Sequence, residues 1–91
     1  MPRIHVERRH GLAPEAARQR VETLARDLAS RLGAEYRWQG NRLCFSRPGA
    51  SGTIALLPDR IELDLKLGLV LAPMKGRIEQ TIREYLDQHV A

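Results

Sequence analysis

Residues 36–45 read YRWQGNRLCF, and this stretch decides the fold class. Large apolar side chains alternate with polar ones on both sides of the central Gly-Asn pair, which is typical of two half-buried β-strands. A two-residue turn there would place Trp38 opposite Leu43. Tyr36 and Phe45 would then face each other on the same side of the strands. The alternation and the register agree, so the stretch predicts a β-hairpin with one face toward a core.

The period of two continues toward the C-terminus. After residues 53–56, the turn residues Pro58-Asp59 predict a second hairpin in which Ile54 lies opposite Leu63 and Leu56 opposite Ile61. The apolar residues of its last strand share one face: Ile61, Leu63, Leu65 and Leu67. Between the two hairpins, Pro48-Gly49 predicts a type II turn inside a looser loop over residues 47–52. Gly68 ends the predicted sheet, of which one side faces a core and the other faces water.

Two segments outside this region have the helical period. The first runs from Pro14 to about Leu32, and Gly33 supplies the left-handed residue that ends it. Its apolar stripe consists of Ala17, Val21, Leu24, Leu28 and Leu32. The second runs from Pro73, again at a first helical position, to the C-terminus, with Gly76 in its first turn as a point of close packing. Its apolar face consists of Met74, Ile78, Ile82, Tyr85, Leu86 and His89.

These segments, with a first strand over residues 3–9, give the order β-α-β-β-β-β-α. We expect one α+β domain over residues 1–91, a two-layer sandwich of an antiparallel sheet with two amphipathic helices on one face. The alternation around Ile4 and Val6 does not say where the first strand lies in the sheet. The longest apolar run, Leu67 to Met74, is too short to cross a bilayer, and the N-terminus shows no apolar signal segment. The sequence therefore favours a cytoplasmic protein.

Residue types that carry catalysis or bind metals are sparse. Cys44 is the only cysteine and lies between Leu43 and Phe45, as expected of a packing residue. The histidines, His5, His10 and His89, do not share the spacing of metal ligands. His10 could transfer a proton, but a turn residue bonded to nearby backbone is the favoured interpretation. We therefore predict no catalytic centre, no metal and no cofactor, and a protein that acts by binding.

The net charge of +4, with thirteen arginines against two lysines, raises the question of nucleic-acid binding. The arginines are scattered along the chain, and acidic residues are interleaved among them. An ordinary solvated surface is the favoured interpretation, and a basic nucleic-acid-binding module stays open as an alternative.

Two groups of residues are candidates for an interaction site. Leu69, Val70 and Leu71 are consecutive and cannot all face one core, so we predict an interaction surface there that includes Met74. The aromatic residues Tyr36, Trp38 and Phe45 are expected in the core. Alternatively they line a site for a small acyl or hydroxyacyl ligand between the sheet and the second helix. A homodimer formed through a sheet edge or through the Leu69–Met74 segment also stays open.

Six stretches of the chain form an ordered set: Ile4-His5-Val6-Glu7-Arg8, His10-Gly11-Leu12, Trp38-Gln39-Gly40-Asn41 with Leu43 and Phe45, Gly49-Ala50-Ser51-Gly52-Thr53-Ile54, Leu67-Gly68 and Pro73-Met74-Lys75. Through this set, nearly the whole chain resembles a short bacterial family, the polyhydroxyalkanoic acid (PHA) system proteins. Ala13 departs from the Ser or Thr expected to cap the first helix. The final hairpin and long helix are also similar to the closing part of helix-grip ligand-binding folds.

The family resemblance implies a bacterial cytoplasmic protein linked to PHA storage granules, and it carries no catalytic residues. The predicted function is therefore that of a non-enzymatic accessory protein of PHA granules or of their regulation, which acts by binding. Its expected partners are the surface of a PHA granule or a granule-associated protein.

Overall fold

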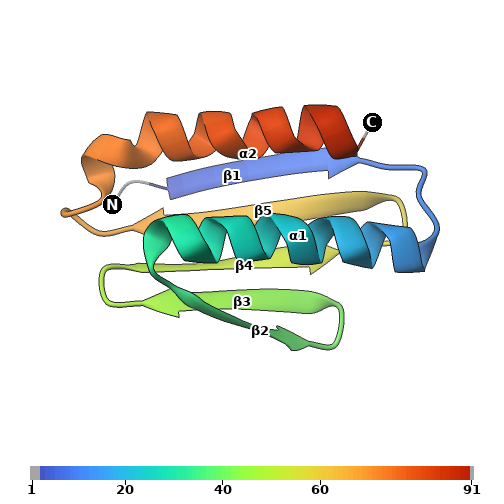
Figure 1. Ribbon diagram of the computed structural model, residues 1–91, viewed down its shortest axis with the longest axis horizontal. Helices are drawn as coiled ribbons and strands as arrows, with labels where there is room; N and C mark the ends of the chain where they lie inside the picture. The colour runs from blue at the N-terminus through green and yellow to red at the C-terminus, as the bar shows by residue number, and fades with distance from the viewer. Residues whose placement is uncertain (1–2, 91) are drawn as a thin grey trace.

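The computed structural model describes residues 3–90 and has the predicted order of strands and helices. Figure 1 shows two long helices packed against a single twisted sheet. The elements are β1 (Arg3–Arg9), α1 (Pro14–Leu32), β2 (Glu35–Gln39), β3 (Arg42–Arg47), β4 (Ala50–Leu56), β5 (Arg60–Leu67), the short 3₁₀ turn η1 (Ala72–Met74) and α2 (Lys75–His89). The α+β fold class is confirmed.

All neighbouring strands of the sheet are antiparallel, in the spatial order β1-β5-β4-β3-β2. The registers predicted for both hairpins are confirmed, since Trp38 lies opposite Leu43 and Ile54 lies opposite Leu63. The first strand, which the sequence could not place, pairs with β5 at one edge, and there Val6 also lies opposite Leu63. The chain therefore crosses from one edge of the sheet, through α1, to the opposite edge.

One face of the sheet and one stripe of each helix form a single core. Strands contribute alternate residues to it, such as Ile4, Leu43 and Leu63, and these are at most 1% exposed. The stripe predicted for α1 is buried throughout, and α2 contributes Ile78, Ile82 and Leu86. Burial of each such side chain stabilises the fold by about 1.5–3 kcal/mol. The opposite face of the sheet carries mostly polar and charged side chains and is not covered by a helix.

The ends of α1 follow from the residues found there. Ala13 at the N-cap has no side-chain hydrogen bond to the first turn, as expected for alanine, and Pro14 lies within that turn. Gly33 ends the helix in the left-handed conformation, with φ of 65°, which a residue without a side chain adopts at little cost.

Three expectations are wrong in detail. The looser loop predicted over residues 47–52 is a two-residue turn, because Arg47 already pairs with Ala50 and the strands continue up to it. Pro73 lies in the 3₁₀ turn η1, so α2 begins at Lys75. Gly76 is not a point of close packing, since a Cβ atom placed there would have no neighbour within 4 Å.

Candidate functional site

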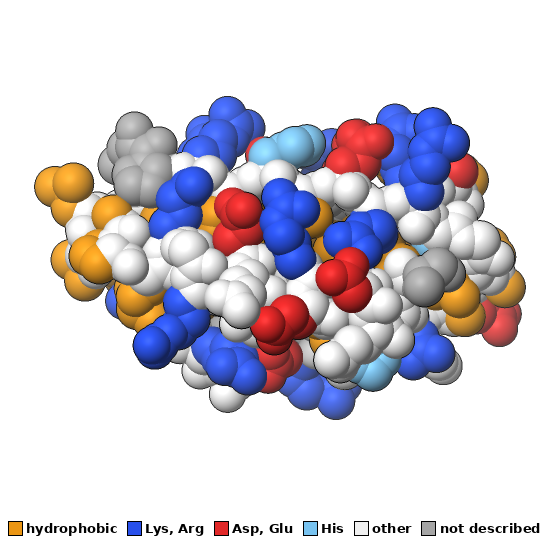
Figure 2. All heavy atoms as spheres, turned by 90° about the horizontal axis from the view of Figure 1, so that it is seen from above, with side chains coloured by type: hydrophobic (Ala, Val, Ile, Leu, Met, Phe, Trp, Pro, Cys, Tyr) orange, Lys and Arg blue, Asp and Glu red, His pale blue; other side chains and the backbone are white. Residues whose placement is uncertain are grey.

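The segment between β5 and α2 exposes a group of large apolar side chains, which we call the apolar end: Leu69, Val70 and Met74. Their exposed fractions are 87%, 83% and 39%. Leu71, which the sequence analysis grouped with them, is only 8% exposed and belongs to the core. The reason is the turn of the chain after Gly68, which directs two consecutive side chains outward and returns the third to the interior. Figure 2 shows hydrophobic side chains projecting at this end of the molecule.

Backbone hydrogen bonds hold the apolar end in place. The N–H of Gly68 donates to the carbonyl of Gly49 over 2.6 Å, which ties the start of the segment to the turn between β3 and β4. The N–H groups of Leu71 and Ala72 both donate to the carbonyl of Gly68, over 3.1 and 3.0 Å. A Cβ atom at position 68 would lie 2.8 Å from the Gly49 oxygen, so glycine is required there. The exposed residues therefore extend from a closed turn with a fixed shape.

Beside the apolar end lies a shallow hollow of about 260 Å³, the basic hollow. It is lined by Arg47, Gly49, Ala50, Ser51, Lys66, Leu67 and Gly68. Arg47 is half-buried, and its guanidinium donates to the carbonyls of Pro48 and Leu32, the latter at the end of α1. Lys66 is exposed on the uncovered face of the sheet, directly opposite Ser51 in the register. Positive charge is thus placed next to exposed apolar surface.

The aromatic residues cluster at the corner between α1 and β2. The Glu22 carboxylate accepts hydrogen bonds from the hydroxyl of Tyr36 over 2.5 Å and from the indole N–H of Trp38 over 2.8 Å. These two bonds hold the pKa of Glu22 below its ordinary value, because they favour the charged form. The guanidinium of Arg18 lies 4.0 Å above the ring of Trp38 in a cation–π contact.

The contacts of this cluster favour a packing role at the margin of the core over a role in ligand binding. Phe45 is buried, with its ring centre 6.3 Å from that of Tyr36, while Tyr36 and Trp38 are half-buried at the margin of the core. The polar groups of both are already bonded to Glu22, which leaves them no free donor to offer a ligand. Sequence reasoning missed Glu22 and Arg18. Because they are four residues apart, the sequence indicates that they share one face of α1. It does not indicate that this face lies against β2.

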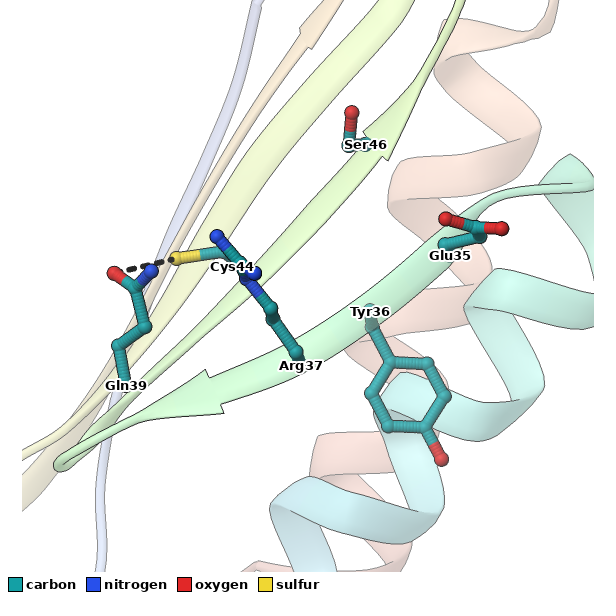
Figure 3. A pocket seen from close by; sticks show the side chains of 6 residues that line it. All are labelled: Glu35, Tyr36, Arg37, Gln39, Cys44 and Ser46. Carbon is teal, nitrogen blue, oxygen red and sulfur yellow. Dashed lines mark hydrogen bonds between the residues drawn. The ribbon is translucent and has the colours of Figure 1, made fainter.

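A second hollow, of about 340 Å³, lies on the uncovered side of β2 and β3. Figure 3 shows its lining: Glu35, Tyr36, Arg37, Gln39, Cys44 and Ser46, with the ring of Tyr36 turned toward the helices. The thiol of Cys44 lies 3.9 Å from the amide oxygen of Gln39. An amide does not take up the proton of a thiol, so this contact does not activate Cys44 as a nucleophile.

His10 bonds to backbone on both sides of its ring. Nδ1 accepts from the N–H of Leu12 over 3.2 Å, so Nε2 carries the proton and donates to the carbonyl of Leu57 over 3.0 Å. The backbone N–H of His10 donates to the carbonyl of Asp59. These bonds join the corner between β1 and α1 to the loop between β4 and β5. The structure therefore supports the turn-residue interpretation of His10.

Two further features of the described part of the chain bear on function. Within residues 3–90, no group of three or more His, Cys, Asp or Glu side chains is arranged to hold a metal ion. Over the same residues, neither helix combines the length and the apolar character needed to cross a membrane.

Comparison with known proteins matches the chain to a sequence family and to a solved structure. The family described as "Putative polyhydroxyalkanoic acid system protein" matches residues 4–90. No curated protein matches the sequence. The NMR structure of PA4090 from Pseudomonas aeruginosa superimposes with a TM-score of 0.58 at 13% identity, over 97% of this chain and 83% of that one. At this identity the likeness concerns the fold alone.

The family match extends over almost the whole chain, from β1 through α2. It includes the glycines that shape the apolar end and the hairpin stretch around residue 40. The protein belongs to the family of polyhydroxyalkanoic acid system proteins.

Proposed function

We propose that this protein is a non-enzymatic accessory protein of the PHA system that attaches to the storage granule through its apolar end. The observation that carries the proposal is the almost complete exposure of Leu69 and Val70 on a closed turn. Exposed apolar side chains that contribute nothing to the core are typical of interaction sites when they are grouped. The family provides the PHA context, and a polyester surface or its protein coat is the partner that this chemistry fits.

The energetics favour reversible attachment. Complete burial of a leucine or valine side chain contributes about 1.5–3 kcal/mol, so Leu69 and Val70 together supply about 3–6 kcal/mol before the cost of association. That is enough for weak binding by one molecule but not for permanent anchoring. A protein that binds in this way would exchange between the granule and the surrounding solution.

The structure gives less support to the two alternatives, nucleic-acid binding and small-ligand binding. Tyr36, Trp38 and Phe45 lie on the helix-covered side of the sheet and pack in or against the core, so they form no exposed platform for nucleic-acid bases. Several arginines are in ion pairs with carboxylates, among them Arg8 with Asp87 and Arg31 with Asp27. The ligand-binding alternative would need Tyr36 and Trp38 to give up their bonds to Glu22.

The test is cell fractionation with a double variant, Leu69→Ser with Val70→Ser. In cells that accumulate polymer, we expect the unaltered protein to sediment with the granules and the variant to stay in the soluble fraction. The control is Gln80→Ser with Gln88→Ser, two exposed positions on α2 away from the apolar end. This control should remain with the granules.

Thermal unfolding shows whether the variants are folded, because neither pair of substitutions removes a core residue. Wild-type protein that is soluble whatever the polymer content would overturn the proposal. So would a folded double variant that still sediments with the granules.

A further inference from the structure

We infer that the basic hollow beside the apolar end binds the headgroup of an anionic lipid, so that this end docks on an anionic lipid surface. The inference rests on the proposed function, because the same two exposed residues enter the surface in both. It adds a second component to the binding, which is electrostatic and selective for the charge of the surface.

The distribution of charge at this end supports the inference. The two segments that build it, residues 43–52 and 65–78, contain Arg47, Lys66, Lys75 and Arg77 and no Asp or Glu. Glu35, opposite Ser46 in the register, offsets one of these charges, and Glu79, whose carboxylate lies 4.0 Å from the Lys75 ammonium, offsets a second. The apolar end is therefore surrounded by an excess of positive charge, whereas acidic and basic side chains are interleaved along the body of the molecule in Figure 2.

Lys66 is the residue best placed to meet an anion. Asp64 lies two positions away on the same face of β5, but its carboxylate is engaged by Arg3 over 3.3 Å and by His5 over 3.2 Å. Ser51, directly across from Lys66 in β4, adds a hydroxyl that can donate to a phosphate oxygen. The ammonium and the hydroxyl thus flank the same part of the basic hollow.

Arg47 contributes charge at a fixed position. Its guanidinium donates to the Pro48 and Leu32 carbonyls beside Gly33, on the helix-covered side of the sheet, so it adds to the positive charge of this end without facing Lys66. The Gly68–Gly49 bond places the hollow and the apolar end on the same rigid support. When Leu69 and Val70 enter the apolar layer of a lipid surface, the hollow lies at headgroup depth. This is the combination of apolar insertion and basic contacts by which peripheral proteins select anionic lipids.

The experiment is flotation of the purified protein with vesicles of phosphatidylcholine alone or mixed with phosphatidylglycerol. We expect binding to the mixed vesicles to be at least about fivefold stronger and to weaken as salt is raised, since each basic residue near an anionic surface adds roughly a factor of five. Lys66→Glu should lower binding to the mixed vesicles about 25-fold, because it removes one attraction and adds a repulsion of similar size. The Leu69→Ser/Val70→Ser variant should lose binding to both kinds of vesicle.

The matched control is Arg42→Glu, which makes the same change in net charge on an exposed residue at the opposite end of β3. We expect it to bind within about twofold of the unaltered protein, since a single charge a Debye length or more from the surface is largely screened. Equal binding to both kinds of vesicle, or equal losses in Lys66→Glu and Arg42→Glu, would overturn the inference. Granule fractionation of Leu69→Ser/Val70→Ser tests the proposed function separately, because attachment to polymer or to a coat protein would persist without lipid selectivity.

Discussion

At the scale of single residues, the charge of Glu22 contributes to the fold through two hydrogen bonds. Its carboxylate accepts bonds from Tyr36 and Trp38 and so joins α1 to β2. We expect Glu22→Gln to lower the free energy of unfolding at pH 7 by about 1–2 kcal/mol, because bonds to a charged acceptor become bonds to a neutral one. Urea unfolding followed by fluorescence of Trp38 measures the change.

The pH dependence of this difference follows from the lowered pKa of Glu22. A carboxyl whose pKa is lower in the folded state stabilises the fold above its ordinary value of 4.5, and that contribution is lost as the pH falls through the folded pKa. The stabilities of the wild type and Glu22→Gln should therefore begin to converge as the pH falls below 4.5 and should meet once the pH is below the lowered pKa of folded Glu22. Glu35→Gln, an exposed control on β2, should match the wild type at pH 7. A constant difference between wild type and Glu22→Gln at all pH values would contradict this assignment.

Gly52 is a second residue with a specific structural role. A Cβ atom there would lie 2.5 Å from the backbone oxygen of Asp64 and 2.7 Å from a methyl group of Leu65. We expect Gly52→Ala to cost about 2 kcal/mol or more of unfolding free energy, because a backbone atom in the middle of a sheet cannot move aside. Gly76→Ala, in the open first turn of α2, should instead add about 1 kcal/mol. Calorimetry should show opposite shifts in the two variants, and a Gly52→Ala variant as stable as the wild type would contradict the steric contact at Gly52.

At the scale of elements, the sequence predicts most where neighbouring segments interact locally. Both hairpin registers followed from alternation and turn residues, because strands joined by a short turn have few ways to pair. The turn at Pro48-Gly49 was predicted too loosely because Ala50, Ser51 and Gly52 are small and show no alternation. The start of α2 was missed because Pro73 fits the first turn of a 3₁₀ helix as well as that of an α-helix.

The segment between β5 and α2 allows a sharp test of which apolar residue belongs to the fold. Leu71 is buried in the core, whereas Leu69, two residues earlier, extends into solvent. We expect Leu71→Ala to lower the free energy of unfolding by about 2–4 kcal/mol and Leu69→Ala to change it by less than about 0.5 kcal/mol. Urea titration of both variants checks this. Comparable losses in the two would mean that Leu69 packs against the fold, and the apolar end would then be no binding surface.

At the scale of the whole molecule, long-range placement is what the sequence leaves open. The alternation of β1 shows that Ile4 and Val6 face a core, but its pairing with β5, more than fifty residues away, depends on the complete fold. The candidate site likewise has one part that the sequence predicts and one part that depends on long-range placement. Exposed apolar residues near position 70 were predicted from three consecutive large side chains. The basic hollow beside them was not, because it brings together the turn after β3 and the end of β5.

The distribution of the core over both helices predicts that the molecule unfolds as one cooperative unit. Ile82 of α2 is fully buried in the same core as Leu24 and Leu28 of α1. Trp38, the only tryptophan, lies in β2 and packs against Arg18 of α1. Its fluorescence therefore reports on the part of the fold that contains α1 and β2, away from α2. We expect Ile82→Ala to lower the free energy of unfolding by about 2–4 kcal/mol as measured both by tryptophan fluorescence and by far-ultraviolet circular dichroism. Leu69→Ala, which removes no core contact, is the control and should shift neither curve. If Ile82→Ala changed the unfolding midpoint measured by circular dichroism but not the midpoint measured by fluorescence, α2 and β1 would unfold independently of the rest.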